Sequence, residues 1–168
     1  MPKIIKDLPL RLTEEARRQV LSSGYGALTI RNVAKHCGVG VGTVYNYYDS
    51  KDALVASFLL EDWKQCLNII HDVSGQAVTP EPVLKAIYDQ LTAFLSLHSA
   101  VFQDKAAAVA FSGSFSHYHS ILRSQLADPL RKFCPDDFSA DFIAEAMLTW
   151  TVSGKPFDAV CHLITKLF

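Results

Sequence analysis

A glycine turn between two short helical patterns, within residues 28–54, constrains this chain more than any other feature. Thr29 occupies an N-cap position, where its hydroxyl can accept from a free amide, and Leu28 and Val33 have the spacing of a hydrophobic staple. Gly38 follows, and glycine closes a helix because it adopts the left-handed conformation without steric cost. The pattern therefore predicts a helix from Thr29 to Cys37 with a buried stripe: Ile30, Val33, Ala34 and Cys37.

A second short helix is predicted directly after the turn, from Val41 to Tyr48. Val39 and Val44 would anchor this helix, and Ser50 would cap a longer helix that follows. The second helix carries a polar and aromatic run: Thr43, Tyr45, Asn46 and Tyr47. Two helices joined by a tight glycine turn are typical of the helix-turn-helix, whose second helix enters the DNA major groove. An ordinary helical hairpin in a bundle is the alternative.

The charge distribution favours the first interpretation. Residues 1–51 carry eight Lys or Arg and four Asp or Glu, a net charge of +4, whereas residues 52–168 carry eight and thirteen, a net charge of −5. The whole chain has a net charge of only −1, but this charge is polarised. A basic N-terminal part indicates that this end of the chain meets a polyanion.

Residues 10–55 resemble the DNA-binding domain of the TetR family of bacterial transcriptional regulators. The resemblance is carried by Gly24-Tyr25, Leu28-Thr29-Ile30, Val33-Ala34, Gly38-Val39, Gly42-Thr43-Val44-Tyr45, Tyr47-Tyr48, Ser50-Lys51 and Leu54. It implies that four side chains contact DNA phosphates: Thr29, Thr43, Tyr47 and Lys51. It further implies that Gly42 allows close backbone approach and that Arg31 belongs to the DNA-binding surface. Tyr45 and Asn46 would face base edges, and an Asn amide suits adenine N6 and N7.

Two positions depart from the family pattern. Family members usually have a small polar N-cap and then a basic residue where this chain has Gly40 and Val41. The chain therefore loses a good N-cap and one expected phosphate contact, and Asp49 adds a negative charge near the expected DNA backbone. Because each neutralised phosphate adds about 0.9 to the salt slope, we expect weaker non-specific DNA affinity than in a typical relative.

The segment before the turn predicts the first helix of a three-helix unit. We expect Asp7-Leu8-Pro9 to open this helix, with Asp7 as its cap. Residues 1–6, with Lys3 and Lys6, are expected to be an untidy terminus, and a DNA-contacting arm is the alternative. This segment is too short for a signal peptide and no apolar run approaches a membrane span, so we expect a cytoplasmic protein. The first helix has an apolar stripe with four-residue spacing: Leu12, Ala16 and Val20.

The remaining chain predicts further helices and no strands, so the expected fold class is all-α, with about nine helices. We expect a helix-turn-helix domain over residues 1–50 and a helical ligand-binding and dimerisation domain over residues 51–168. The helices expected after residue 49 span residues 50–74, 80–95, 101–111, 115–133 with a kink or split at Pro129, 138–151 and 157–167.

By the same resemblance, the last two helices form a homodimer interface, and a cavity for an unidentified small-molecule effector lies among the middle helices. Completion of the monomer core is the alternative for both sets of apolar residues. The interface would use Phe142, Ile143, Met147, Trp150, Phe157, Val160, Cys161, Ile164 and Leu167. The cavity would be lined by Trp63, Tyr88, Phe94, His98, Phe111, Phe115, His117, Tyr118 and Trp150.

Signals for a metal site or for catalysis are weak in this sequence. His117-x-His119, Cys134 and Cys161-His162 lack the spacing of a metal site, and the sequence has no nucleophile elbow, phosphate loop or dinucleotide fingerprint. We therefore expect no metal, no cofactor and no enzyme, but a homodimeric, ligand-responsive repressor that binds a palindromic operator in double-stranded DNA. The alternative, kept open by Gly40 and Val41, is a small-molecule or protein-binding module that has lost operator binding.

Overall fold

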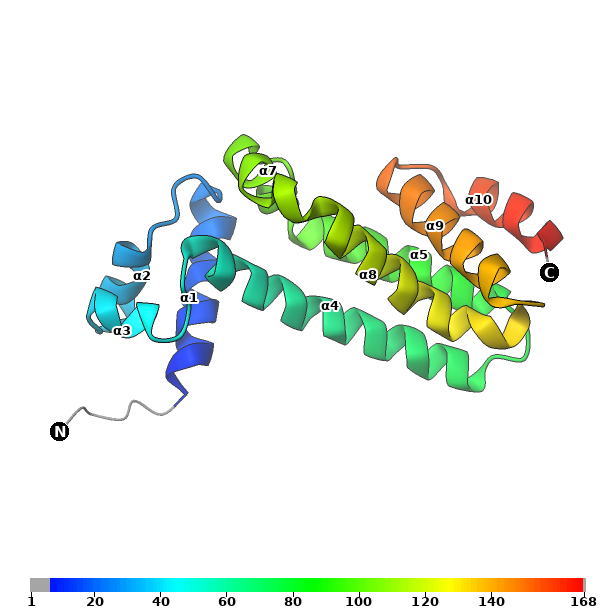
Figure 1. Ribbon diagram of the computed structural model, residues 1–168, viewed down its shortest axis with the longest axis horizontal. Coiled ribbons are helices and arrows are strands. Elements are labelled where there is room, and N and C mark those ends of the chain that lie inside the picture. Colours follow the sequence, from blue (N-terminus) through cyan, green and yellow to red (C-terminus); the bar gives the residue numbers. More distant parts are fainter. Residues whose placement is uncertain (1–6, 168) are drawn as a thin grey trace. The chain divides into compact units, whose positions relative to one another are not determined.

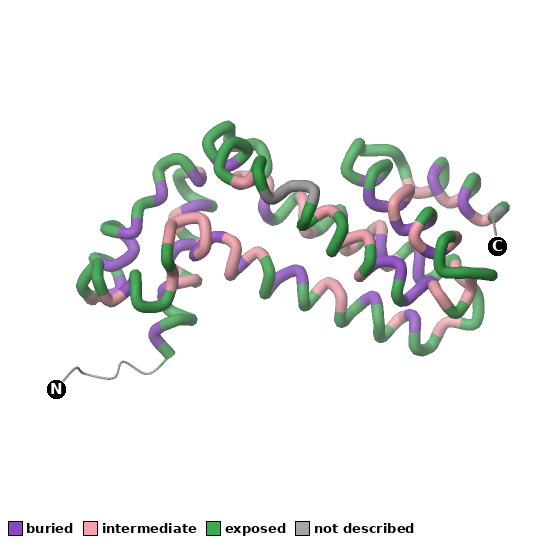
Figure 2. The backbone as a smooth tube through the Cα atoms, in the orientation of Figure 1, coloured by how far each residue is buried: buried purple, intermediate pink, exposed green. Residues whose placement is uncertain are grey.

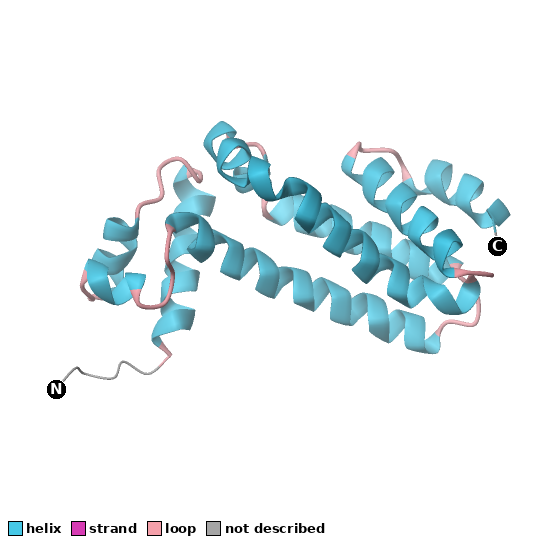
Figure 3. Cartoon of the chain, viewed as in Figure 1, coloured by secondary structure: helices cyan, strands magenta, loops and turns pink. Residues whose placement is uncertain are grey.

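Figure 1 shows the chain as a computed structural model, which describes residues 7–167 except for the side chains of residues 114–116 and 167. All regular secondary structure in the described residues is helical (Figure 3), which confirms the predicted all-α class. Contacts divide the described chain into two compact units: the residues up to 62 with 98–112, and residues 63–97 with those from 113 onward. Residues 1–6, expected to be an untidy terminus or alternatively a DNA-contacting arm with Lys3 and Lys6, lie outside the described residues.

The first unit packs short helices around one apolar core. In Figure 2 the buried positions recur along these helices at the spacing of one helix face. The predicted stripe of the first helix is fully buried, with Leu12 and Ala16 at 0% and Val20 at 1% exposure. The unit contains α1 (Leu8–Ser23), α2 (Ile30–Cys37), α3 (Val41–Tyr45), the start of α4 (Lys51–Gln76), α6 (Ser99–Phe102) and α7 (Lys105–Phe111).

Helix α1 begins without the side-chain cap that the sequence predicts. Asp7 stands at the N-cap position, but its φ is 57° and its side chain makes no capping hydrogen bond. Its carbonyl accepts from the Arg11 amide instead, at 3.1 Å. The left-handed backbone accounts for the failed prediction, because an N-cap side chain needs an extended backbone to reach the first-turn amides.

Helix α4 begins as predicted and contributes to both units. The Ser50 hydroxyl accepts from the Ala53 amide at 3.0 Å, which caps the helix. Leu54 and Phe58 are buried in the core of the first unit, so that core extends beyond the expected boundary at residue 50. Ile69 of the same helix is 47% exposed.

The predicted helix over residues 101–111 is two helices, which raises the number of α-helices in the described chain to ten. The break lies at Asp104, whose carboxylate accepts from the amides of Ala106 at 2.8 Å and Ala107 at 3.3 Å. An Asp side chain that binds these amides competes with the helix backbone and starts a new helix. Asp104 is therefore the N-cap of α7.

The second unit is a bundle around a second apolar core. Its largest fully buried side chains include Ile70, Leu84, Ile87, Leu130 and Met147. Beyond the end of α4 the unit contains α5 (Glu81–Leu97), α8 (Phe115–Ala127), the 3₁₀ segment η2 (Asp128–Phe133), α9 (Asp137–Val152), α10 (Phe157–Ile164) and η3 (Thr165–Leu167), and η1 (Ser112–Ser114) precedes α8.

The predicted split at Pro129 is confirmed, because α8 ends at Ala127 and the chain continues as η2. Proline lacks an amide hydrogen and breaks the helical ladder. The Pro129 carbonyl accepts from the buried Ser74 hydroxyl at 2.9 Å, and Lys132 donates to the carbonyl of Ala77 at 3.0 Å. These two bonds fasten the end of α4 to η2.

Candidate nucleic-acid interface

The start of α2 is fixed by the predicted cap. Thr29 has extended backbone angles, φ −135° and ψ 143°, and its hydroxyl accepts from the Asn32 amide at 3.2 Å. Leu28 and Val33 are buried at 1% and 0% exposure, as a hydrophobic staple requires. The cap and staple together set the direction in which the chain enters α2.

The turn after α2 is a Schellman motif. Gly38 has φ 68°, its amide donates to the Lys35 carbonyl at 3.2 Å, and the Val39 amide donates to the Ala34 carbonyl at 3.0 Å. This pair of bonds closes the helix and needs a residue in the left-handed region, for which glycine is best suited. The prediction of a glycine turn at this point is confirmed.

Helix α3 is shorter than predicted: it ends at Tyr45 rather than at Tyr48. Gly40 stands at its N-cap and offers no side chain to the first-turn amides. At its end the Tyr47 amide donates to the Val44 carbonyl at 3.0 Å, an i to i−3 bond that tightens the last turn. Asn46 and Tyr47 therefore project from a turn that follows the helix.

Several predicted DNA-contacting side chains are exposed on α2, α3 and the turn that follows. Tyr45 and Tyr47 are 49% and 50% exposed, and Asn46 is also exposed. On α2, Arg31 and Lys35 are exposed, and neither makes an ion pair with another described residue. These side chains offer two cations, two phenols and an amide to a partner.

Lys51, which is predicted to contact a DNA phosphate, also makes contacts within the first unit. Its side chain is half-buried, its ammonium donates to the Tyr25 carbonyl at 3.3 Å, and it lies 4.0 Å from the centre of the Tyr25 ring. Lys51 therefore stabilises the loop before α2 in addition to any phosphate contact. Thr43 is half-buried, and its hydroxyl lies on the side of α3 toward Gly40.

Gly42 has no structural requirement within the first unit. A Cβ added at this residue would meet no heavy atom within 4 Å, and its φ is not in the left-handed region. Glycine lowers helix stability by roughly 0.5–1 kcal/mol relative to alanine. The fold itself thus gives no reason for glycine here, and the close partner approach expected at Gly42 stays a prediction.

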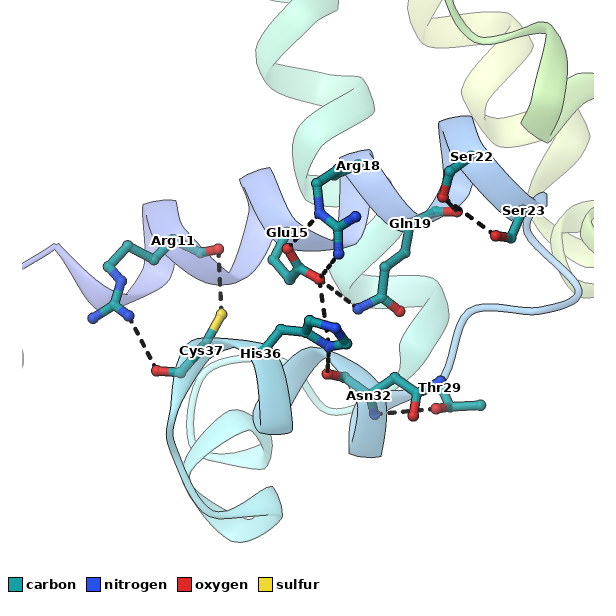
Figure 4. A network of polar contacts seen from close by, with 10 residues as sticks. All are labelled: Arg11, Glu15, Arg18, Gln19, Ser22, Ser23, Thr29, Asn32, His36 and Cys37. Atoms are coloured by element: carbon teal, nitrogen blue, oxygen red, sulfur yellow. Dashed lines mark hydrogen bonds and ion pairs between the residues drawn. The ribbon is translucent and has the colours of Figure 1, made fainter.

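A polar network that the sequence did not predict joins α1 to α2 (Figure 4). The Glu15 carboxylate accepts from Arg18 Nε at 2.8 Å and Gln19 Nε2 at 2.7 Å, and His36 Nδ1 lies 3.7 Å from it. The hydrogen bond from Arg18 is the main cause that lowers the pKa of Glu15 to about 2. Glu15 stays ionised and balances cations beside the proposed DNA-facing helices.

Arg11 of α1 contacts the C-terminal end of α2. Its guanidinium donates to the Cys37 carbonyl at 3.1 Å, which satisfies a carbonyl at the end of α2, and the Cys37 thiol faces the Arg11 carbonyl at 3.5 Å (Figure 4). Burial raises the pKa of the Cys37 thiol. The thiol therefore remains protonated and behaves as a small apolar side chain, as expected for a buried cysteine.

The loop between α1 and α2 is held by acidic side chains from later in the chain. The Asp104 carboxylate accepts from the Gly26 amide at 2.9 Å, and this bond is the main cause that lowers the pKa of Asp104. The Tyr25 hydroxyl donates to Asp52, and burial together with this carboxylate raises the pKa of Tyr25. These contacts position the start of α2 from α4 and α7.

Residues 12–58 match the family model of bacterial regulatory proteins, tetR family. This segment of the chain matches the DNA-binding part of TetR-family regulators. Among curated proteins, the HTH-type transcriptional regulator UidR of Escherichia coli strain K12 is 28% identical over 57 residues, which cover 34% of this chain and 29% of UidR. The match therefore spans less than a third of the length of UidR.

Solved structures share the whole fold at low sequence identity. SCO7518 of Streptomyces coelicolor A3(2), a candidate transcriptional regulator, is 12% identical, with a TM-score of 0.73 over 96% of this chain and 98% of that chain. A TetR transcription regulator from Haloarcula marismortui is 22% identical, with a TM-score of 0.58 over 97% and 95%. FadR of Bacillus subtilis, solved in complex with stearoyl-CoA, is 16% identical, with a TM-score of 0.56 over 92% and 96%.

The residues that the TetR resemblance assigns to a dimer interface divide into two groups. Met147, Val160 and Ile164 are buried in the core of the second unit, as is Ile143, so these four complete the monomer core. Phe157 and Cys161 are half-buried against that core, and the side chain of Leu167 lies outside the described residues. Among the described side chains of the predicted set, Phe142 and Trp150 are the exposed large ones, at 53% and 49%.

An exposed apolar face nevertheless runs along α9 and α10. Phe138 at 77% and Leu163 at 66% exposure belong to this face, and the sequence prediction missed both. Phe138, Phe142 and Trp150 are spaced by multiples of four residues and therefore share one side of α9. The face contains an apolar groove of about 350 Å³, lined by Phe142, Ala146, Trp150, Lys155, Ala159, Val160, Leu163 and Ile164.

The side chains predicted to line a ligand cavity occur in both units and form separate aromatic contacts. Trp63 packs against Phe94 with ring centres 5.4 Å apart, and its indole nitrogen donates to Gln125 at 2.8 Å. The other contacts are Tyr88 with Phe157, His98 with Phe58, and Phe111 with Tyr25. His117, Tyr118 and Trp150 are exposed, and the side chain of Phe115 lies outside the described residues.

These positions do not identify an effector cavity in the described part of the chain, and the effector site stays a prediction. No group of three or more His, Cys, Asp or Glu side chains in that part could hold a metal ion. None of the described helices is long and apolar enough to span a membrane.

Proposed function

We propose that this protein regulates transcription by binding duplex DNA through α2 and α3. One observation carries the proposal: a helix-turn-helix with a closed glycine turn leaves Arg31, Lys35, Tyr45 and Tyr47 exposed beside open space at Gly42. Cations and phenols are donors to phosphate oxygens, and close approach of a DNA backbone explains a glycine that the fold does not need. The family match over residues 12–58 supports the same surface. Such a protein acts on the chromosome, so we place it in the cytoplasm.

We also propose that the protein binds a palindromic operator as a homodimer. One helix-turn-helix contacts few base pairs, and a two-fold dimer presents two of them to symmetric half-sites. The exposed face of α9 and α10 supports this, because Phe142, Trp150 and Leu163 are exposed and line one apolar groove in the second unit. Exposed apolar faces mark sites of interaction with other proteins, and a second copy of this chain is the partner proposed here.

A ligand-responsive repressor role completes the proposal. It rests on the family resemblance and on α4, which contributes residues to both units. An effector that binds one arrangement of the chain more tightly shifts the population of DNA-binding dimers by its differential affinity. FadR of Bacillus subtilis has been solved with stearoyl-CoA, and by analogy the effector is a small molecule held by the second unit.

The alternative is a binding module without operator recognition. Gly40, which leaves α3 without a side-chain cap, and Val41, which stands where a basic residue is usual, favour it. The two functions differ in their response to salt and competitor. A regulator binds a specific duplex in excess competitor and loses affinity steeply as salt rises, whereas a module shows only weak association with any sequence.

The experiment is a binding titration by fluorescence anisotropy, with a duplex selected from a random pool. Arg31→Ala and Tyr47→Ala should weaken binding to all duplexes similarly, and Arg31→Ala should reduce the salt slope by about 0.9. Lys64→Ala is the matched control, because Lys64 is an exposed cation of α4 in the second unit. Unchanged affinity in both α2–α3 variants would remove this surface from the proposal.

A further inference from the structure

The surface of α3 contains no cationic side chain. From Val39 to Asp49 the chain has no Lys or Arg, so α3 and the turn that follows present only apolar, hydroxyl, phenol and amide groups, and one carboxylate. The cations of the proposed interface lie on α2, at Arg31 and Lys35, and at Lys51, which already donates to the Tyr25 carbonyl. The helix expected to enter the major groove therefore lacks the usual partners of guanine.

This absence limits which bases α3 can recognise. Guanine presents two acceptors, O6 and N7, in the major groove, and the commonest specific contact to them comes from Arg or Lys. Thymine presents the C5-methyl group, and adenine presents a donor beside an acceptor. The apolar and amide side chains that α3 and the following turn present suit thymine and adenine.

Val41 is the first residue of α3 and is 37% exposed. Its neighbours in sequence are Gly40 and Gly42, which have no side chains, and it does not belong to the apolar core of the first unit. Its side chain is therefore partly open to a partner outside the protein. A thymine methyl group is an apolar partner of matching size in the major groove.

Asn46 supplies the complementary polar group. Its side chain is exposed and makes no hydrogen bond within the described residues, while its backbone amide donates to the Gly42 carbonyl at 3.2 Å. The backbone of Asn46 is thus held by a hydrogen bond, and its side-chain amide is available to a base. An Asn amide can donate to adenine N7 and accept from adenine N6 at the same time.

We propose that the base pairs facing α3 are A·T pairs, with Val41 packed against a thymine C5-methyl group and Asn46 paired with adenine. This inference rests on the proposed DNA-binding function and defines the class of operator that the surface selects. The replacement of a basic residue by valine is then a change of base preference as well as the loss of a phosphate contact.

The test uses the full-length protein and a duplex selected from a random pool. Each thymine of one half-site is replaced in turn by deoxyuridine, which removes only the methyl group. We expect one replacement to weaken binding about fourfold, the value for one buried methyl-sized group. The same replacement should have no effect on Val41→Ala protein, and Asn46→Ala should reduce discrimination for adenine at a neighbouring pair.

Val78→Ala is the matched control, since Val78 is 92% exposed in the second unit and should leave the uracil effect unchanged. The uracil measurement on wild-type protein does not depend on the folding of any variant. If no thymine replacement weakens binding, or if the loss persists in Val41→Ala, the inference is wrong while the proposed function stands. If no duplex is selected at all, the proposed function fails, and the inference fails with it.

Discussion

Gly42→Ala should make the protein more stable and its DNA binding weaker. The added methyl group would meet no heavy atom within 4 Å in the free protein, and the backbone φ suits alanine. Alanine in place of a helical glycine stabilises by about 0.5–1 kcal/mol, which for a chain of 168 residues raises the unfolding midpoint by about 1–4 °C. Differential scanning fluorimetry at fixed pH measures this shift.

The same methyl group should weaken the binding of DNA. Inserted between α3 and a closely packed DNA backbone, it should cost about 1–3 kcal/mol, or roughly 5- to 150-fold in Kd. Gly75→Ala is the control, because Gly75 also lies in a helix, is exposed, and has no heavy atom within 4 Å of an added Cβ. That variant should gain similar stability and keep wild-type affinity. If Gly42→Ala bound DNA as tightly as wild type, no partner would approach α3 closely at this residue.

Three further predictions concern the cap, the buried histidine and the apolar face. Thr29→Ala should lower the free energy of unfolding in urea by about 1 kcal/mol, because the Asn32 amide loses its acceptor; an unchanged midpoint would exclude the cap as a stabilising contact. Burial lowers the pKa of His98 below 6.5, against the raising effect of Asp62, so its contribution to stability is present above pH 6.5 and lost as the pH falls through the folded-state value. His98→Gln should therefore reduce the fall in midpoint between pH 7.5 and 5, and an identical pH profile would contradict this. Phe142→Asp should convert a dimer into a monomer of 18.6 kDa by sedimentation, and a variant that sediments as wild type would remove this face from the interface.

The sequence predicted those parts of the fold that local chemistry determines. Thr29 and Ser50 cap their helices, Gly38 closes α2, and Pro129 ends α8, because each acts through bonds within a few residues. Asp104 shows the limit of this reasoning. It divides a predicted helix and also binds the Gly26 amide, 78 residues away in sequence, and a local pattern does not contain the second contact.

The candidate interfaces show a similar limit. The exposed groups of α2 and α3 followed from a motif whose spacing fixes which side chains face outward. On α9 and α10, by contrast, apolar side chains surround the helices on more than one side, so the sequence could not separate Met147 in the core from Phe138 on the surface. The Glu15 network was missed because it depends on how α1 crosses α2, although an acidic residue near Arg18 and Gln19 was a local signal.

Selection of tight-binding duplexes from a random pool, with purified wild-type protein at physiological salt, is the most direct test of DNA recognition by α2 and α3. We expect enrichment of a palindrome whose two half-sites are separated by about one helical turn of DNA. A second selection with the Arg31→Ala, Tyr47→Ala double variant should enrich nothing. A folded, self-associating wild-type protein that enriched no sequence would contradict the assignment of α2 and α3 as a DNA-recognition surface.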